Sequence, residues 1–259
     1  MTQAQQPVGD QIRWWRGHRR MTQLDLASRA DVSTRHVSFL ETGRAQPTRA
    51  MLLRLGEHLD IPLRGRNALL LAAGFAPAYP EHELSDVPMA VVADAIGTIL
   101  AAHAPNPALV VDRHWTLVDA NETVALLTAG VAPALLEPPV NVLRLSLHPD
   151  GMAPRITNLP QWRAHVLHRL DHQIDATGDD LLRCLRDELA GYPGGTAPAS
   201  VGPALVVPLR VRVDGRDLAF LSTTTVFGTP LDVAVSELAI ETFFPADAAT
   251  AQYLADETP

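Results

Sequence analysis

The chain has 259 residues, of which 47% are hydrophobic and 19% are charged. This length exceeds the ~100–200 residues of a typical domain and predicts two domains. The apolar content excludes a disordered chain, because enough surface can be buried to offset the chain entropy. The single cysteine cannot form an internal disulfide. With no signal-peptide pattern and no apolar run near the ~20 residues that cross a bilayer, we expect a cytoplasmic protein without membrane contact.

The charge divides unevenly along the chain. Residues 1–78 contain 11 arginines and six acidic residues, a net charge of +5, whereas residues 79–259 contain 10 arginines and 23 acidic residues, a net charge of −13. Such a change of sign predicts two parts with different partners. We expect a first domain over 1–78, a helical linker over 79–106 bracketed by prolines, and a second domain over 107–259.

The basic part shows the pattern of short helices. Thr22 and Ser33 are placed to cap helices over residues 23–30 and 34–41. The turn between these two helices has the length found in a helix-turn-helix. Asp31, in this turn, tolerates a left-handed backbone better than most residues.

Further helices are expected before Thr22, after Thr48 and after Pro62, which makes five. This region contains Thr22-Gln23, Leu26-Ala27, Val32-Ser33, Val37-Ser38, Glu41-Thr42-Gly43-Arg44 and Pro47. With these residues the sequence resembles the Xre/Cro/C1-repressor type of helix-turn-helix.

The resemblance implies that Ser33 to Glu41 is a recognition helix in the major groove of double-stranded DNA. The residues expected to contact DNA are Thr34 and Arg35 at base edges, His36 and Ser38 at bases or phosphates, Phe39 at a thymine methyl group, Gln23 at a phosphate, and Arg20, Arg44 and Arg49 through non-specific attraction. It also implies that Arg16 pairs with Glu41 in an architectural role. For any single arginine, the alternative is a solvated surface charge.

The acidic part predicts two strands, several helices and then three strands. The expected strands are 108–112, 115–119, 204–213, 218–227 and 233–244. The expected helices are 121–129 capped by Asn121, 141–147, 160–175 and 179–191. This order predicts an α+β chain, in which an all-α helix-turn-helix domain precedes a PAS-like domain with a five-stranded antiparallel sheet and covering helices.

The acidic part also contains a series of motifs: Asn121, Asn141-Val-Leu-Arg144, Leu147-His148-Pro149-Asp150-Gly151, Trp162-Arg163, Thr223-Thr-Thr-Val-Phe227-Gly228-Thr-Pro, Leu231-Asp232, Glu237-Leu238-Ala-Ile-Glu241 and Phe243-Phe244-Pro-Ala-Asp247. Through these motifs it is similar to the C-terminal domain of MmyB-like transcriptional regulators. The resemblance implies a sensor domain that binds a fatty-acid-like molecule, with no other cofactor.

An apolar ligand with a carboxylate head requires an apolar pocket and a bidentate donor. We expect Arg144 and His148 to bind the head, with Arg155 and Arg163 in reserve. The expected lining is Leu143, Leu145, Leu147, Trp162, Leu167, Phe220 and Phe227. For each apolar residue the alternative is ordinary core packing, and for Arg144 and His148 it is a structural hydrogen bond.

The favoured interpretation is a non-enzymatic, ligand-responsive transcription factor that binds an operator as a homodimer. His165, His168 and His172 fall on one helix face, so a haem, metal or redox sensor is the main alternative. An enzyme with a DNA-targeting module is a more distant one. The sequence offers no nucleophile elbow and no phosphate-binding loop for catalysis.

Overall fold

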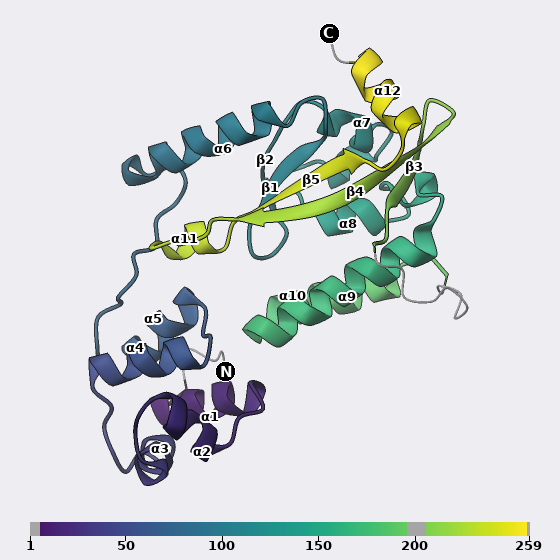
Figure 1. Cartoon of the computed structure of the whole chain (residues 1–259). Helices are drawn as coiled ribbons and strands as arrows, with labels where there is room; N and C mark the ends of the chain where they lie inside the picture. Colours follow the sequence, from purple (N-terminus) through teal and green to yellow (C-terminus); the bar gives the residue numbers. More distant parts are fainter. Residues whose placement is uncertain (1–5, 196–205, 258–259) are drawn as a thin grey trace. The chain divides into compact units, whose positions relative to one another are not determined.

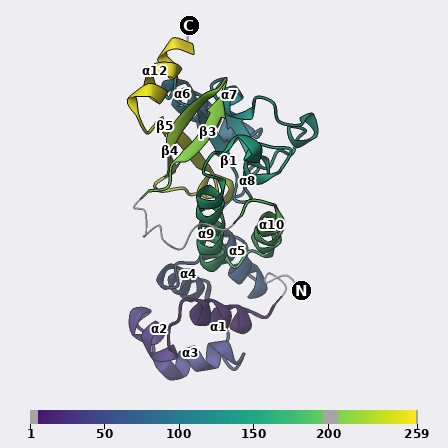
Figure 2. The ribbon, with the colours of Figure 1, turned by 90° about the vertical axis from the view of Figure 1, so that its right-hand side faces the viewer.

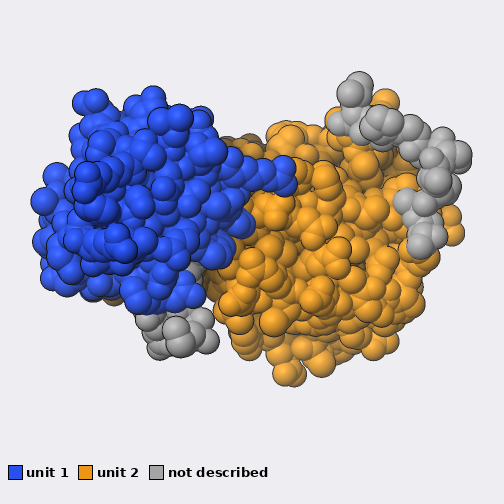
Figure 3. Space-filling model, turned by 90° about the horizontal axis from the view of Figure 1, so that it is seen from below, with its two compact units in different colours: residues 1–82, 230–236 blue, residues 83–229, 237–259 orange. Residues whose placement is uncertain are grey.

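The computed structural model describes residues 6–195 and 206–257, which form two compact units (Figure 1, Figure 3). Unit 1 consists of the described residues of Met1–His82 together with Pro230–Ser236. Unit 2 consists of those of Glu83–Thr229 and Glu237–Pro259. Residues 230–236 therefore belong to unit 1, although the sequence pattern places them in the second domain. Within the described ranges, no helix has both the length and the apolar character needed to span a membrane.

Unit 1 is all-α. Its helices are α1 (Val8–His18), α2 (Gln23–Arg29), α3 (Thr34–Glu41), α4 (Arg49–His58), α5 (Leu63–Ala72) and the short α11 (Val233–Ser236). The five predicted N-terminal helices are thus confirmed. They bury one continuous core, whose fully buried members include Ile12, Leu26, Val37, Leu40, Leu52, Leu55 and Leu70.

The predicted caps of unit 1 are confirmed. The Thr22 hydroxyl accepts a hydrogen bond from the Asp25 amide at 3.1 Å, and the Asp25 carboxylate accepts one from the Thr22 amide at 2.8 Å, which completes a capping box. Ser33 accepts from the His36 amide at 3.1 Å. Asp31 has φ +51°, so the α2–α3 turn has the left-handed residue that its length requires.

Unit 2 is built on one antiparallel sheet. Its strands are β1 (Ala108–Val111), β2 (Leu117–Ala120), β3 (Leu209–Val213), β4 (Arg216–Val226) and β5 (Ala239–Pro245), in the order β2-β1-β5-β4-β3. The predicted α+β class and five-stranded antiparallel sheet are confirmed. The first half of the predicted strand 204–213 is not, because residues 206–208 are not in a strand and residues 204–205 lie outside the described residues.

The helical elements of unit 2 are η2 (Val87–Met89), α6 (Ala90–Ala102), α7 (Val124–Thr128), η3 (Pro133–Leu135), α8 (Val142–Leu147), η4 (Ala153–Arg155), α9 (Leu159–Thr177), α10 (Asp180–Gly191) and α12 (Ala248–Glu257). Helices α9 and α10 lie side by side (Figure 2).

Side chains of β1 alternate between the two faces of the sheet and enter two separate cores. Leu109 and Val111 pack with residues of α8, α9 and α10, whereas Ala108 and Val110 pack with Ile96 and other residues of α6. Strand β1 is therefore buried on both faces, which explains its uninterrupted apolar sequence. The larger core, on the Leu109 face, also contains the cavity described below.

Two sequence predictions for unit 2 are wrong. Asn121 does not cap a helix. Its side-chain oxygen accepts a hydrogen bond from the Ala108 backbone amide at 3.0 Å, and its side-chain nitrogen donates to the Asn106 backbone carbonyl at 2.9 Å, while α7 begins only at Val124. Residues 233–236 form helix α11, not a strand, because the Asp232 carboxylate accepts from the Ala234 amide at 2.8 Å and starts a helical turn.

Candidate functional site

Helix α3 has one buried and one open face. Val37 and Leu40 are buried in the core of unit 1. Of the predicted base-contacting residues, Arg35 is exposed, and Thr34, His36, Ser38 and Phe39 are half-buried. The Arg35 guanidinium lies 5.1 Å from the centre of the Phe39 ring, a cation–π contact that orients the arginine along the helix.

A buried glutamate joins α1, α2 and α3. Glu41 is 2% exposed, and Arg16 binds its carboxylate through Nε at 2.6 Å and Nη2 at 3.0 Å. Gln23 donates to the same carboxylate at 2.8 Å, and Arg13 donates to the Glu41 backbone carbonyl at 2.7 Å. The hydrogen bond to Glu41 raises the pKa of Arg16 above its usual value. The Arg16–Glu41 pair that the resemblance implies is therefore present. Gln23, which was expected to contact a phosphate, donates its side-chain amide to Glu41.

Arg20, Arg44 and Arg49 are all exposed, and within the part of the chain that the structure describes none of them forms an ion pair. Uncompensated arginines of this kind are suited to attract phosphates. Their contacts with DNA remain predictions, as do those of α3.

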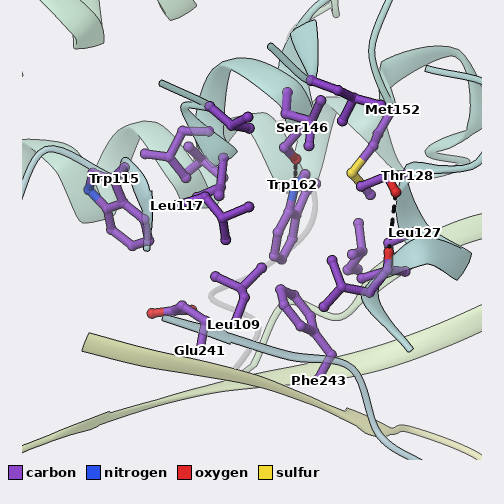
Figure 4. A pocket seen from close by; sticks show the side chains of 18 of the residues that line it. Leu109, Trp115, Leu117, Leu127, Thr128, Ser146, Met152, Trp162, Glu241 and Phe243 are labelled. Atoms are coloured by element: carbon purple, nitrogen blue, oxygen red, sulfur yellow. Dashed lines mark hydrogen bonds between the residues drawn. The ribbon is translucent and has the colours of Figure 1, made fainter. Parts of the chain in front are cut away.

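Unit 2 contains an apolar cavity of about 220 Å³ (Figure 4). Its walls come from β1, β2, β3, β5 and the helices α7, α8 and α9, with the β2–α8 connection. The lining residues are Leu109, Trp115, Leu117, Val124, Leu127, Thr128, Leu136, Val140, Val142, Leu143, Leu145, Ser146, Met152, Trp162, Val166, Arg169, Leu209, Glu241 and Phe243.

An arginine–glutamate pair forms part of the cavity wall. Glu241, in β5, is only 3% exposed. Arg169 of α9 binds its carboxylate with Nη2 at 2.7 Å and Nη1 at 3.1 Å. Thr224, opposite Glu241 on β4, donates to the carboxylate at 2.7 Å and accepts from Arg169 at 2.9 Å. The guanidinium also lies 4.7 Å from the centre of the Trp115 ring.

Two hydroxyl groups complete the polar part of the lining. Ser146 accepts a hydrogen bond from the Trp162 indole at 2.9 Å. Thr128 donates to backbone carbonyls of its own helix. In Figure 4, Glu241 and Trp115 lie at one end of the cavity and Thr128 at the other, with Ser146 between them. The cavity is therefore apolar along its length, with the charged pair at one end.

Of the residues predicted to bind a ligand, Leu143, Leu145 and Trp162 line the cavity. The others lie elsewhere. Leu147 and Phe220 are fully buried in the surrounding core, Leu167 packs at its edge, and Phe227 packs against the opposite core. His148 accepts from the Asp150 amide at 3.0 Å, Arg163 donates to the Ala190 carbonyl, and Arg155 donates to the Leu127 carbonyl.

The favoured anchor, Arg144, forms a separate ion pair outside the cavity lining. It binds Glu188 of α10 with Nε at 2.7 Å and Nη2 at 2.8 Å, and Tyr192 donates to the same carboxylate. The bond from Arg144 lowers the pKa of Glu188 to about 2. Burial and the bond to Glu188 raise the pKa of Tyr192 to about 12. This network joins α8 to α10. Arg144 thus has a structural hydrogen-bonding role, which was the alternative to ligand contact.

Sequence reasoning missed Arg169, Glu241 and Phe243. The signal for Glu241 was its place in the strand Ala-Ile-Glu-Thr-Phe-Phe, where a charged residue among apolar ones is buried with a partner. Nothing local identified Arg169 as that partner, because 72 residues separate the two.

The histidines of α9 do not converge on one point. His168 and His172 approach each other, with their Nε2 atoms 3.0 Å apart, whereas the ring centre of His165 lies 5.4 Å from that of Trp162. Burial, together with the charge of Arg169, lowers the pKa of His165 below its usual value. Among the described residues, no three histidine, cysteine or acidic side chains are placed to share a metal ion.

A helix-turn-helix unit joined to a unit with an apolar cavity defines the class of DNA-binding regulators that respond to a small molecule. Comparison with known families agrees with both parts. Residues 12–65 match the model described as Helix-turn-helix, and residues 92–256 match that of the MmyB-like transcription regulator ligand binding domain. The second match spans more than half of the chain, so the chain belongs to the MmyB-like transcription regulators. A search of curated proteins found no match.

Proposed function

We propose that the cavity of unit 2 is the effector site of this ligand-responsive transcription regulator, and that the effector is a small molecule with a fatty-acid-like apolar body. The observation that carries the proposal is the lining, in which aliphatic and aromatic side chains surround about 220 Å³ of space. This volume is below the ~300–1,000 Å³ of typical ligand pockets and favours a short chain. Each methylene transferred from water into such a site contributes about 0.8 kcal/mol.

The sequence position of β5 supports a route from the cavity to the DNA-binding unit. Glu241 and Phe243 of β5 line the cavity, and β5 follows α11 in the chain. Helix α11 packs within unit 1. The Val233 amide donates to the Pro80 carbonyl at 2.9 Å, and Nδ1 of His82 lies 2.8 Å from Oδ2 of Asp232. In this proposal, effector binding shifts the population of conformations that place two α3 helices of a homodimer in half-sites ~34–36 Å apart.

The test fills the cavity from one strand. Leu117 lines the cavity, whereas its neighbour Val118 is 37% exposed and points to the other face of β2. Leu117→Trp should therefore abolish binding of octanol measured by titration calorimetry, as well as any effector retained by the purified protein in native mass spectrometry. Val118→Trp should bind as the parent protein does. Equal octanol binding by both variants contradicts the site.

A further inference from the structure

The charged groups of the cavity are already paired with each other. In the part of the chain that the structure describes, Arg169 and Glu241 are the two charged residues that line the cavity. Both terminal nitrogens of Arg169 bind the Glu241 carboxylate, at 2.7 and 3.1 Å. The wall therefore carries no net charge, and its guanidinium is not available to a second carboxylate without disturbing the first.

From this arrangement, and resting on the proposed effector site, we propose that the effector is electrically neutral. Its class is a short apolar chain or ring that carries an alcohol, amide, ester or lactone group. Glu241 is then a specificity-determining residue that excludes carboxylates.

The free energy of charge burial supports this assignment. An ionised carboxylate that enters the cavity either places a second negative charge beside Glu241 or displaces it from Arg169. In the second case Glu241, which is 3% exposed, becomes an unpaired buried charge. Both outcomes are costly in an apolar site. An ammonium group meets the same obstacle from Arg169.

The hydroxyl groups of the lining suit a neutral head. Ser146 accepts from Trp162 at 2.9 Å, and its own hydroxyl hydrogen has no acceptor among the described residues. A carbonyl or hydroxyl oxygen of the effector can accept that hydrogen without any change in charge. The fatty-acid head that the family resemblance implies lacks a comparable partner, because Arg144 is bound to Glu188 outside the lining.

Three molecules with one chain length separate these possibilities. Octanol, octanamide and octanoate are titrated into the full-length protein by calorimetry at pH 8, where octanoate is ionised. We expect octanol and octanamide to bind and octanoate to bind at least about tenfold more weakly. Octanoate that enters as the protonated acid should lose affinity by about tenfold for each unit of pH above its own pKa, whereas octanol should be insensitive to pH.

A variant at Glu241 tests the cause. Glu241→Gln removes the negative charge and keeps the shape, so Arg169 becomes free for a carboxylate. This variant should bind octanoate at least about tenfold more tightly than the parent, with little change for octanol. Glu122→Gln, the same change at an exposed residue of unit 2, should leave all three affinities unchanged.

The outcomes are distinct. Binding of octanoate to the parent protein at pH 8 as tightly as octanol overturns the neutral effector and leaves the effector site intact. Failure of all three molecules to bind the parent at any pH overturns the effector site itself. If Glu241→Gln does not fold, the pH dependence of octanoate binding to the parent protein still decides between a neutral and an ionised ligand.

Discussion

Each unit of this regulator buries one glutamate against one arginine, but the surroundings of the two pairs differ. Glu41 in unit 1 is 2% exposed and Glu241 in unit 2 is 3% exposed, and each accepts two hydrogen bonds from its arginine. Glu41 is also bound by Gln23 and is enclosed by packed helices. Glu241 borders open space. The same kind of ion pair thus joins helices where the core is filled, and forms the charged part of the wall where the core contains a cavity.

Removing the arginine of the closed pair should have the largest effect. Arg16→Met leaves Glu41 buried without its main partner and should lower the free energy of unfolding by about 3–5 kcal/mol, measured by urea denaturation. Arg44→Met replaces an exposed arginine in the same unit and should change it by less than about 0.5 kcal/mol. Equal unfolding midpoints for the two variants would show that the Arg16–Glu41 pair is not structural.

The exposed arginines of unit 1 offer the next test. Arg35 and Arg44 are exposed to solvent, whereas Arg16 and Arg169 are half-buried in ion pairs. Arg35→Ala should weaken binding to the operator by about 1–3 kcal/mol and relax base preference at one position, while the fold survives. Arg44→Ala should weaken binding to all DNA sequences alike. It should also reduce the slope of log affinity against log salt concentration by about one. Both are measured by fluorescence anisotropy over a series of salt concentrations. Unchanged specificity in Arg35→Ala would contradict its placement at a base edge.

The exposed pair of unit 2 should have the smallest effect. The side chains of Arg144 and Glu188 are 39% and 36% exposed, so the pair should contribute less than about 1 kcal/mol. Because the pKa of Glu188 is lowered from 4.5 to about 2, this contribution is present above pH 4.5 and is lost as the pH falls toward 2.

The pH dependence of the melting temperature between pH 6 and pH 3 measures this contribution. The parent protein should lose more stability on acidification than Glu188→Gln does, and parallel curves would refute the pair's contribution. Octanoate affinity should be the same in the parent protein and in Glu188→Gln, in contrast to the tighter octanoate binding expected of Glu241→Gln.

Local features of the fold could be predicted from the sequence. The caps expected at Thr22, Ser33 and Thr48 are all present, because a cap depends on one side chain and an amide three residues away. Short apolar segments bounded by turn residues likewise identified the sheet, although not every strand boundary.

Features that depend on distant partners could not be predicted. Asn121 has the sequence of a helix cap, but its side chain instead bonds the backbone of Asn106 and Ala108 at the start of β1. Residues 233–236 have the apolar content of a strand, but Asp232 caps them as a helix that packs in unit 1. The predicted anchor Arg144 stands in a motif, whereas Arg169 is recognisable only from the folded position of Glu241.

The placement of α11 limits how this protein can be divided. The chain passes from one unit to the other at residues 82–83, again at 229–230 and once more at 236–237. A fragment that stops at His82 lacks part of unit 1, and one that starts at Glu83 carries α11 without the helices it packs on. A chimera that joins unit 1 to a different sensor domain would therefore also have to contain residues 230–236. The two units are thus not independent segments joined by a single linker.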